Sequence, residues 1–303
     1  MNELINIREF IDSQIGGDFP LATENFAKLD SCLRREMTIA GNKMILLYNP
    51  ERKRSVAAKT DKASIAARRC FLCRDNLPER QGAIEVDGYQ IRMNPYPITR
   101  DHLTIVLSDH EQQLIRGRLD DMAKFAARLE GFTVFYNGPV SGASAPDHFH
   151  FQAVPTDELP LWENLAKDLA TLKPGGWKVT FSQPSVIAAK LPEDGSTKML
   201  DRLIEKLPLK KDDDEPRFNI LMRRNGGNTE AVIIPRKCHR ASTFTADPES
   251  TDGFCLAPAC VEMAGVIIAV REIDFERLTP KDYQRILSEV CYTPSELIKL
   301  LGR

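Results

Sequence analysis

Apolar and polar residues alternate along the first half of the chain with periods that predict both helices and strands. Residues 1–40 carry apolar side chains at helical spacing and are expected to pack as helices. A short apolar run over 43–48 predicts a strand, and similar runs over 103–107 and 132–136 predict two more. Between the last two, residues 111–130 are apolar at roughly helical spacing, which predicts a connecting helix.

The second half shows a similar mixture of elements. Apolar runs over 218–224 and 231–240 flank Gly226 and Gly227, a pattern typical of a β-hairpin with glycines in its turn. The other expected elements are a helix over 160–172, a strand over 177–181 and a helix near 198–206. The pattern changes after Pro155, and we divide the chain after residue 156 into an N-terminal and a C-terminal half.

Composition excludes several classes of protein. The chain has 303 residues, of which 42% are hydrophobic, enough to bury a substantial core in one large or two medium domains. Its 41 basic and 43 acidic residues give a net charge of −2, so no overall basic field favours nucleic-acid binding. No apolar run approaches the length of a membrane span. The seven cysteines are irregularly spaced and the N-terminus has no signal-peptide pattern, so we expect a cytoplasmic protein without a disulfide framework.

The stretch around His148, His150 and Gln152 carries the strongest chemical signal. On a strand, these alternate residues would project from the same face. Residues 136–147, which precede them, are rich in Gly, Ser, Asn and Pro, so a tight loop is expected to deliver free backbone N–H groups beside the histidines. An imidazole can attack phosphorus while such donors neutralise the phosphoryl oxygens, which predicts phosphoryl chemistry. The alternative is a surface or half-buried histidine pair without a catalytic role.

A second group of residues has the composition of a metal site. Cys70 and Cys73 form a C-x-x-C motif whose two thiolates would supply half of a tetrahedral shell. His110 and His148 could complete it as a Cys2His2 zinc site. The alternatives are a redox-active C-x-x-C and a pair of core cysteines. Four protein ligands would leave no open position for substrate, so the zinc would be structural and would orient the strand that carries His150.

The segment over 137–152 resembles the active-site segment of the histidine-triad superfamily, in the branch that has Gln as its third motif residue. That branch contains galactose-1-phosphate uridylyltransferase, diadenosine tetraphosphate phosphorylase and the GDP-hexose phosphorylases. Its pattern is an Asn, a small-residue loop with G-x-S, and H-x-H-x-Q, which falls here on Asn137, Gly142, Ser144, His148, His150 and Gln152. The upstream C-x-x-C and His110 match positions that uridylyltransferases use as metal ligands together with the first motif histidine. The resemblance therefore also implies zinc.

The resemblance implies an α+β fold, in which an antiparallel sheet of the histidine-triad type is flanked by helices and built from two similar halves. Residues 1–156 would form the N-terminal half, with the zinc site and the H-x-H-x-Q motif. Residues 157–303 would form a phosphorylase-like C-terminal half that completes the nucleotide and phosphate site. In support, residues 255–275 resemble the closing segment of diadenosine tetraphosphate phosphorylases. A homodimer is a candidate assembly.

The implied activity is transfer of a nucleoside monophosphate through a covalent intermediate on His150. The donor would be a nucleoside diphosphate sugar or a dinucleoside polyphosphate, and the acceptor a phosphate or a sugar phosphate. Gln152 would donate hydrogen bonds to a leaving phosphate, but its amide can neither protonate a leaving group nor activate water, which favours transfer over hydrolysis. No organic cofactor is expected. A nucleotide hydrolase and a zinc-stabilised nucleotide-binding protein without turnover remain alternatives.

The remaining candidate residues would bind substrate. The resemblance places Asn94 near the ribose or base, and Asn137, Gly142 and Ser144 at the phosphate-binding loop. His102 is either a capping or structural residue or a substrate contact. Two basic clusters compete for the second phosphate group. They contain Arg52, Arg54 and Lys59 before the C-x-x-C motif, and Arg223, Arg236, Lys237, His239 and Arg240 around the predicted hairpin.

Overall fold

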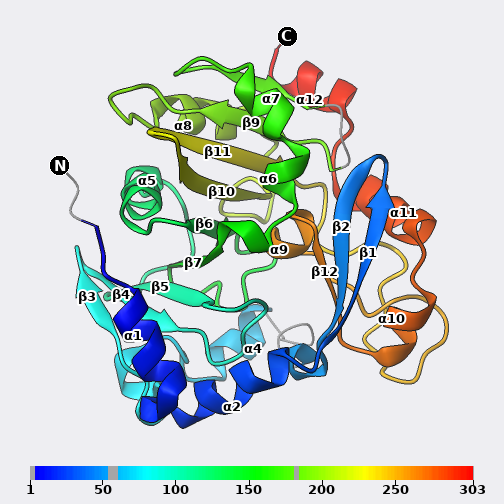
Figure 1. Cartoon of the computed structure of the whole chain (residues 1–303). Helices are drawn as coiled ribbons and strands as arrows, with labels where there is room; N and C mark the ends of the chain where they lie inside the picture. Colours follow the sequence, from blue (N-terminus) through cyan, green and yellow to red (C-terminus); the bar gives the residue numbers. More distant parts are fainter. Residues whose placement is uncertain (1–3, 54–60, 181–183, 303) are drawn as a thin grey trace.

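The computed structural model describes residues 4–53, 61–180 and 184–302 (Figure 1). Within these residues, one large sheet forms the centre of the molecule. Its nine strands follow the order β3 (Ile84–Val86), β4 (Tyr89–Met93), β5 (Leu103–Leu107), β7 (His150–Pro155), β6 (Phe132–Asn137), β10 (Phe218–Asn225), β11 (Asn228–Pro235), β9 (Ile187–Lys190) and β8 (Trp177–Val179). Every neighbouring pair is antiparallel. The predicted α+β fold with an antiparallel sheet is therefore confirmed.

The sheet joins strands from both halves of the chain. Its first five strands come from residues up to 155, and its last four come from later residues. Strands β6 and β10 pair at the junction, where Asn219 lies opposite Asn137. The predicted hairpin of β10 and β11 is confirmed around Gly226 and Gly227, both of which have positive φ. The two halves thus share one continuous sheet, and the exact boundary after residue 156 stays a prediction.

A smaller sheet ties the N-terminal part of the chain to its C-terminal part. β1 (Leu33–Ile39) and β2 (Asn42–Tyr48) form an antiparallel hairpin, and β12 (Val266–Ala269) pairs with β2 in parallel. Figure 1 shows this blue hairpin beside the orange β12. The residues of β1 form a strand although their spacing predicts a helix. The reason is that Ala40 and Gly41 take positive φ angles and turn the chain back on itself.

The two faces of the large sheet pack against different helices. Along β7, Phe151 and Ala153 face one hydrophobic core, whereas His150 and Gln152 face the other side. The first core also contains residues of α1 (Arg8–Ser13), α2 (Pro20–Leu29), α5 (Leu119–Arg128), α8 (Lys198–Ile204) and α12 (Pro294–Leu300). The second core contains residues of the smaller sheet and of α6 (Leu161–Asn164), α7 (Ala166–Ala170), α9 (Cys260–Met263) and α11 (Pro280–Val290), and Phe275 of α10 (Glu272–Arg277) packs against it. A short helix, α4 (Lys62–Ala66), precedes the C-x-x-C motif.

The helix predicted over 111–130 is confirmed only from Leu119 onward, as α5. The preceding residues are irregular because the side chain of Gln113 is buried and bonds the backbone of β6 and β7. The helices predicted over 160–172 and 198–206 are confirmed as α6, α7 and α8. Among the described residues, no helix combines the length and the apolar character that a membrane crossing requires.

Candidate functional site

Strand β7 lies between β5 and β6 in the large sheet, so its polar side chains have neighbours on both sides. Gln152 lies opposite Thr104 of β5 and Phe135 of β6. His150 lies two residues earlier, opposite Val106 of β5. Because side chains alternate along a strand, His150 and Gln152 project from the same face. Both line one cavity.

The imidazole of His150 is buried and held in one tautomer. Its Nδ1 lies 2.8 Å from the carbonyl oxygen of His148, which can only accept, so Nδ1 carries the proton and Nε2 keeps its lone pair. Gln113 fixes the backbone of His150 by accepting from its N–H at 2.7 Å and donating to its carbonyl at 2.9 Å. Burial lowers the pKa of His150 to about 4, so the ring is neutral at neutral pH. A neutral imidazole with an available lone pair can act as a nucleophile.

The loop before β7 brings small residues to the same cavity, which Gly142 and Ser144 line. Their backbone N–H groups donate to no partner within the part of the chain that the structure describes. Gly142 has a φ of +107° and packs closely against Ala259 of the C-terminal half. Unpaired N–H groups beside a histidine can bind an anion such as a phosphate.

Gly142→Ala is expected to destabilise the protein and to distort this loop. An added Cβ would lie 2.4 Å from the Cβ of Ala259, and a φ of +107° is unfavourable for any side chain. The overlap and the backbone strain together should lower the free energy of unfolding by about 2–3 kcal/mol. Gly41→Ala is the matched control, because Gly41 also has a positive φ but an added Cβ there meets no atom within 4 Å. Equal losses of stability in the two variants, measured by thermal unfolding, would contradict the importance of the Ala259 contact.

The cavity has a volume of about 400 Å³, within the range of small-molecule sites. Near the C-x-x-C motif its wall combines apolar and polar side chains, namely Phe71, Leu72, Leu77, Pro78, Asn76, Gln81, Arg92 and Asn94. The C-terminal half contributes His239, Arg240, Ala257, Ala259, Val261, Glu262 and Ile268. An apolar wall that continues into polar groups suits a nucleoside attached to phosphates. Both halves are therefore needed to form the site.

Cys70, Cys73, His110 and His148 form a cluster close to the start of β7. Their potential ligand atoms all lie within 4.8 Å of one another. The Nδ1 of His148 is 3.3 Å from the sulfur of Cys70, and the Nδ1 of His110 is 3.2 Å from the sulfur of Cys73. The ligands of a tetrahedral zinc ion are separated by about 3.3–3.8 Å, given Zn–S and Zn–N bonds of roughly 2.3 and 2.0 Å. These four residues therefore could hold a metal ion of this kind.

Two further features favour a cation in this cluster. The Nε2 of His148 donates to the carbonyl oxygen of Leu107 at 2.8 Å, which leaves Nδ1 as the ligand atom. Burial and the neighbouring Cys70 raise the pKa of Cys73 to about 11, so a nearby positive charge would be needed to ionise its thiol at neutral pH. Because the carbonyl of His148 also accepts from His150, an ion bound here would restrain the histidine in the cavity.

His239 is a member of the predicted basic clusters that does line the cavity. Burial and then two nearby arginines lower its pKa to about 4, so its ring is neutral at neutral pH. Arg52 and Arg240 also line the cavity. Arg54 and Lys59 lie outside the described residues. The described cavity wall therefore includes one cation of each predicted basic cluster, Arg52 from the N-terminal half and Arg240 from the C-terminal half.

Arg236 and Lys237 lie outside the cavity wall that the described residues form. The guanidinium of Arg236 is buried and donates to the side chain of Asn219 at 2.7 Å and to the carbonyl of Pro258 at 2.9 Å. Lys237 forms an ion pair of 2.9 Å with Glu296. The structure thus directs the side chains of neighbouring basic residues to different partners.

The sequence patterns do not reveal Gln113 and Asn219, although both hold the site together. Asn219 donates to the side-chain oxygen of Asn137 and to the carbonyl of Ser141, each at 2.8 Å. The backbone N–H of Cys260 donates to the same oxygen of Asn137 at 2.9 Å. With this oxygen engaged twice, Asn137 offers its amide nitrogen to the cavity that it lines. The one sequence signal for Asn219 is a polar residue inside an otherwise apolar run.

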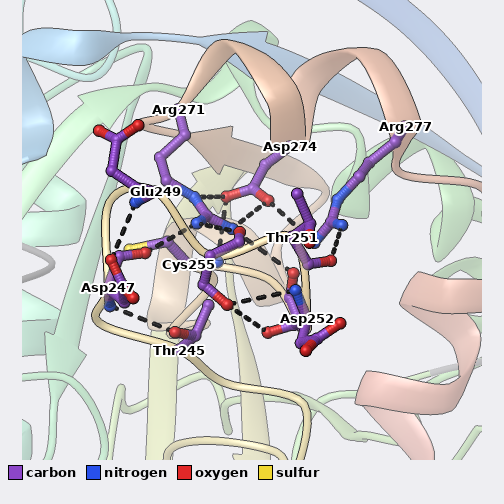
Figure 2. Close-up of polar contacts among 11 residues, drawn as sticks. Thr245, Asp247, Glu249, Thr251, Asp252, Cys255, Arg271, Asp274 and Arg277 are labelled. Atoms are coloured by element: carbon purple, nitrogen blue, oxygen red, sulfur yellow. Dashed lines mark hydrogen bonds and ion pairs between the residues drawn. The ribbon is translucent and has the colours of Figure 1, made fainter.

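An ion-pair network holds the loop between β11 and α9, whose two ends line the cavity. Figure 2 shows Arg271 and Asp274 at the centre of this network. Arg271 donates to the carboxylate of Asp274 at 2.6 and 2.7 Å, and to the carbonyl of Asp247 at 2.8 Å. Asp274 is fully buried and accepts from the N–H of Cys255 at 3.0 Å. Removing either partner would leave a buried charge unpaired, which is unfavourable. The network therefore restrains the loop between β11 and α9.

Known families and structures resemble this chain to different degrees. Residues 10–155 match a family described as a domain of unknown function, DUF4922. No curated protein matches the sequence. Yeast Ap4A phosphorylase Apa2 in complex with Ap4A aligns with a TM-score of 0.60 and 17% identity, over 97% of this chain and 99% of the other. The two proteins share a fold.

Two further structures of the yeast enzyme agree with this result. The complex of Apa2 with AMP has a TM-score of 0.60 and 17% identity, over 93% of this chain and 97% of the other. A third structure of Apa2 has a TM-score of 0.58 and 17% identity, over 97% and 96%. The likeness to a phosphorylase fold, expected from the H-x-H-x-Q segment, is confirmed. At this identity the likeness establishes the fold, and the activity must be argued from the site.

Proposed function

We propose that this protein is a nucleotidyltransferase or phosphorylase that acts through a covalent nucleotidyl-histidine on His150. The main support is the arrangement around one cavity of a neutral His150, the amide of Gln152 and the unpaired N–H groups of Gly142 and Ser144. A positioned nucleophile and donors for phosphate oxygens are the groups that phosphoryl transfer requires.

The first half-reaction begins with attack of the Nε2 of His150 on the α-phosphorus of the donor. A P–N bond forms, the bond from that phosphorus to the bridging oxygen breaks, and the bridging oxygen leaves as a phosphate oxygen of the departing group. The ring gains a positive charge, and its Nδ1–H stays bonded to the carbonyl of His148. In the second half-reaction, an oxygen of inorganic phosphate or of a sugar phosphate attacks the same phosphorus and forms a P–O bond. The P–N bond breaks, its electron pair returns to Nε2, and His150 leaves as the neutral imidazole.

The amides of the site would stabilise negative charge during both steps. Gln152, Asn137 and the N–H groups of Gly142 and Ser144 can all donate to phosphate oxygens. None of them can deliver a proton to a basic leaving group, so the leaving group must already be acidic, as a phosphate is. This favours transfer between phosphates over hydrolysis of a poor leaving group.

The fold suggests which donor to test first. Structures of yeast Apa2 contain Ap4A or AMP, and that enzyme is an Ap4A phosphorylase. We propose a dinucleoside polyphosphate as the first donor class and nucleoside diphosphate sugars as the second. Asn94 and the wall near the C-x-x-C motif would face the nucleoside. Arg52, His239 and Arg240 would face the second phosphate group.

The metal in this proposal is a structural zinc ion. Its ligands would be Cys70, Cys73, His110 and His148, and four protein ligands leave no position for substrate. The ion would hold His148 in place and so support the position of His150. None of the seven cysteines forms a disulfide, which fits the reducing cytoplasm that we propose as the location.

Intact-mass measurement tests the proposal directly. The purified protein is mixed, without acceptor, with Ap4A, a GDP-hexose, a UDP-hexose or an ADP-sugar. We expect a mass increase of one nucleoside monophosphate with at least one donor, and we expect inorganic phosphate to remove it as a nucleoside diphosphate. An adduct that water removes equally fast would favour a hydrolase. Absence of any adduct, in protein that binds zinc and nucleotide, would favour a binding protein without turnover.

A further inference from the structure

We propose that His102 is a positioning residue that orients the side-chain amide of Gln152, so that the NH2 group of Gln152 faces the phosphates of the substrate. This role rests on the proposed function, because it specifies how Gln152 meets a phosphate. The sequence leaves two alternatives for His102, a capping or structural residue and a substrate contact. In the proposed role, the buried ring of His102 acts on the substrate through Gln152, which lies in the cavity wall.

The surroundings of His102 exclude direct contact with a ligand in the cavity. His102 lies immediately before β5, and its side chain is fully buried. Its ring lies against Phe135 of β6, with centroids 6.3 Å apart and planes inclined by 29°. His102 is absent from the cavity wall formed by residues 4–53, 61–180 and 184–302, whereas Gln152 belongs to it. His102 can therefore influence chemistry through Gln152.

Two hydrogen bonds determine where the proton of the His102 ring lies. The backbone N–H of Ile98 donates to Nδ1 at 3.2 Å, so Nδ1 is the unprotonated nitrogen. Nε2 therefore carries the hydrogen, and it lies 2.9 Å from the Oε1 of Gln152, to which it donates. Burial and the nearby Arg52 lower the pKa of His102 to about 3, so the ring keeps this single proton at neutral pH.

The orientation of the Gln152 amide follows from this bond. A glutamine amide can turn over with little change of shape, which exchanges an acceptor oxygen for two N–H donors. Because His102 offers Gln152 a donor, the amide oxygen faces His102 and the NH2 group points away from it. The NH2 group has no partner within the described part of the chain, and Gln152 lines the cavity. Turned the other way, Gln152 would present its oxygen to phosphate oxygens, and two acceptors repel each other.

The tautomer of His102 can be measured in the wild-type protein by NMR after nitrogen-15 labelling of its histidines and glutamines. We expect the hydrogen on Nε2 and an unprotonated Nδ1. We also expect the side-chain NH2 resonances of Gln152 to shift when inorganic pyrophosphate or AMP binds. A hydrogen on Nδ1, or Gln152 resonances that do not change at saturating ligand, would overturn the proposal. Neither result requires turnover, so this measurement decides the role of His102 even if no donor forms an adduct and the proposed function fails.

A double-mutant cycle tests the same role in the reaction. His102→Phe and Gln152→Ala are each expected to slow the nucleotidylation of His150 by Ap4A roughly 10- to 100-fold, the effect of losing a hydrogen bond to a charged group. The double variant should be no slower than Gln152→Ala alone, because His102 acts through Gln152.

If the rate losses of the two single variants multiply in the double variant, the result would contradict this role. It would indicate that His102 only stabilises the turn at Ile98. His102→Gln provides the conservative variant, since its amide can accept from Ile98 and donate to Gln152. Recovery of part of the rate in His102→Gln, at a melting temperature equal to that of His102→Phe, would separate positioning from stability. A rate that remains as low as that of His102→Phe would argue against positioning.

Discussion

His150→Ala is expected to abolish the nucleotidylated form of the protein and to reduce turnover at least about 10⁴-fold, as removal of a covalent nucleophile does. The reason is that the Nε2 of His150 is the nucleophilic atom of the proposed reaction, and its lone pair is fixed by the bond from Nδ1 to His148. Intact-mass measurement and steady-state kinetics with the same donor report the two effects separately.

The protein should keep its fold in this variant. The β7 backbone at position 150 is held by Gln113 through main-chain groups that alanine retains, so melting temperature should change little. His239→Ala is the matched comparison, because His239 is the other histidine of the described cavity wall and is also neutral. We expect His239→Ala to form the adduct and to lose rate in the transfer to phosphate. An adduct that persists in His150→Ala and disappears in His239→Ala would assign the nucleophile to the C-terminal half instead.

The motif itself was predictable from sequence because its geometry is local. Alternation on any strand places His150 and Gln152 on one face, whatever the rest of the fold. The close grouping of Cys70, Cys73, His110 and His148 was also predictable, but for a different reason. Structural zinc is bound mainly by cysteine and histidine, so these residue types narrow the choice of ligands even when they are far apart in sequence.

The residues that support the motif were not predictable, because they depend on strand order. Asn219 reaches Asn137 since β10 pairs with β6, and periodicity says nothing about which strands are neighbours. Gln113 lies where apolar spacing suggested a helix, and its buried amide gives no periodic signal. Tertiary hydrogen bonds of this kind override local preference.

Charge alone was an incomplete guide to the phosphate-binding residues. Arg236, Lys237 and His239 are close in sequence, yet their side chains meet Asn219, Glu296 and the cavity, respectively. A basic cluster in a sequence identifies available cations but not the direction in which each side chain points. Arg236 shows why: its guanidinium is buried and donates to groups inside the protein, so it does not reach the cavity.

Cys73→Ser is expected to remove stoichiometric zinc and to lower the free energy of unfolding by at least about 3 kcal/mol. The reason is that a structural metal binds the folded protein and not the unfolded chain, so its binding free energy adds to the stability of the fold. The expectation follows from a cluster whose ligand atoms are already within 4.8 Å of one another, and from the raised pKa of Cys73, whose thiol needs a nearby cation to ionise at neutral pH. Metal analysis of the purified protein and thermal unfolding, with and without a chelator, measure the two effects.

Cys32→Ser is the matched control, since Cys32 is a half-buried free cysteine outside the cluster. It should keep both zinc and stability, and the chelator should lower the melting temperature of Cys32→Ser but not that of Cys73→Ser. Loss of zinc should also lower the rate of nucleotidylation. His148 would bind the ion through its side chain, and its backbone carbonyl accepts from the Nδ1–H of His150, so the ion would help to position His150. We expect the rate of adduct formation to fall with zinc content, at a temperature where Cys73→Ser is still folded. Full rate in folded, zinc-free protein would show that the sheet alone orients His150 and would leave the ion a role in stability only.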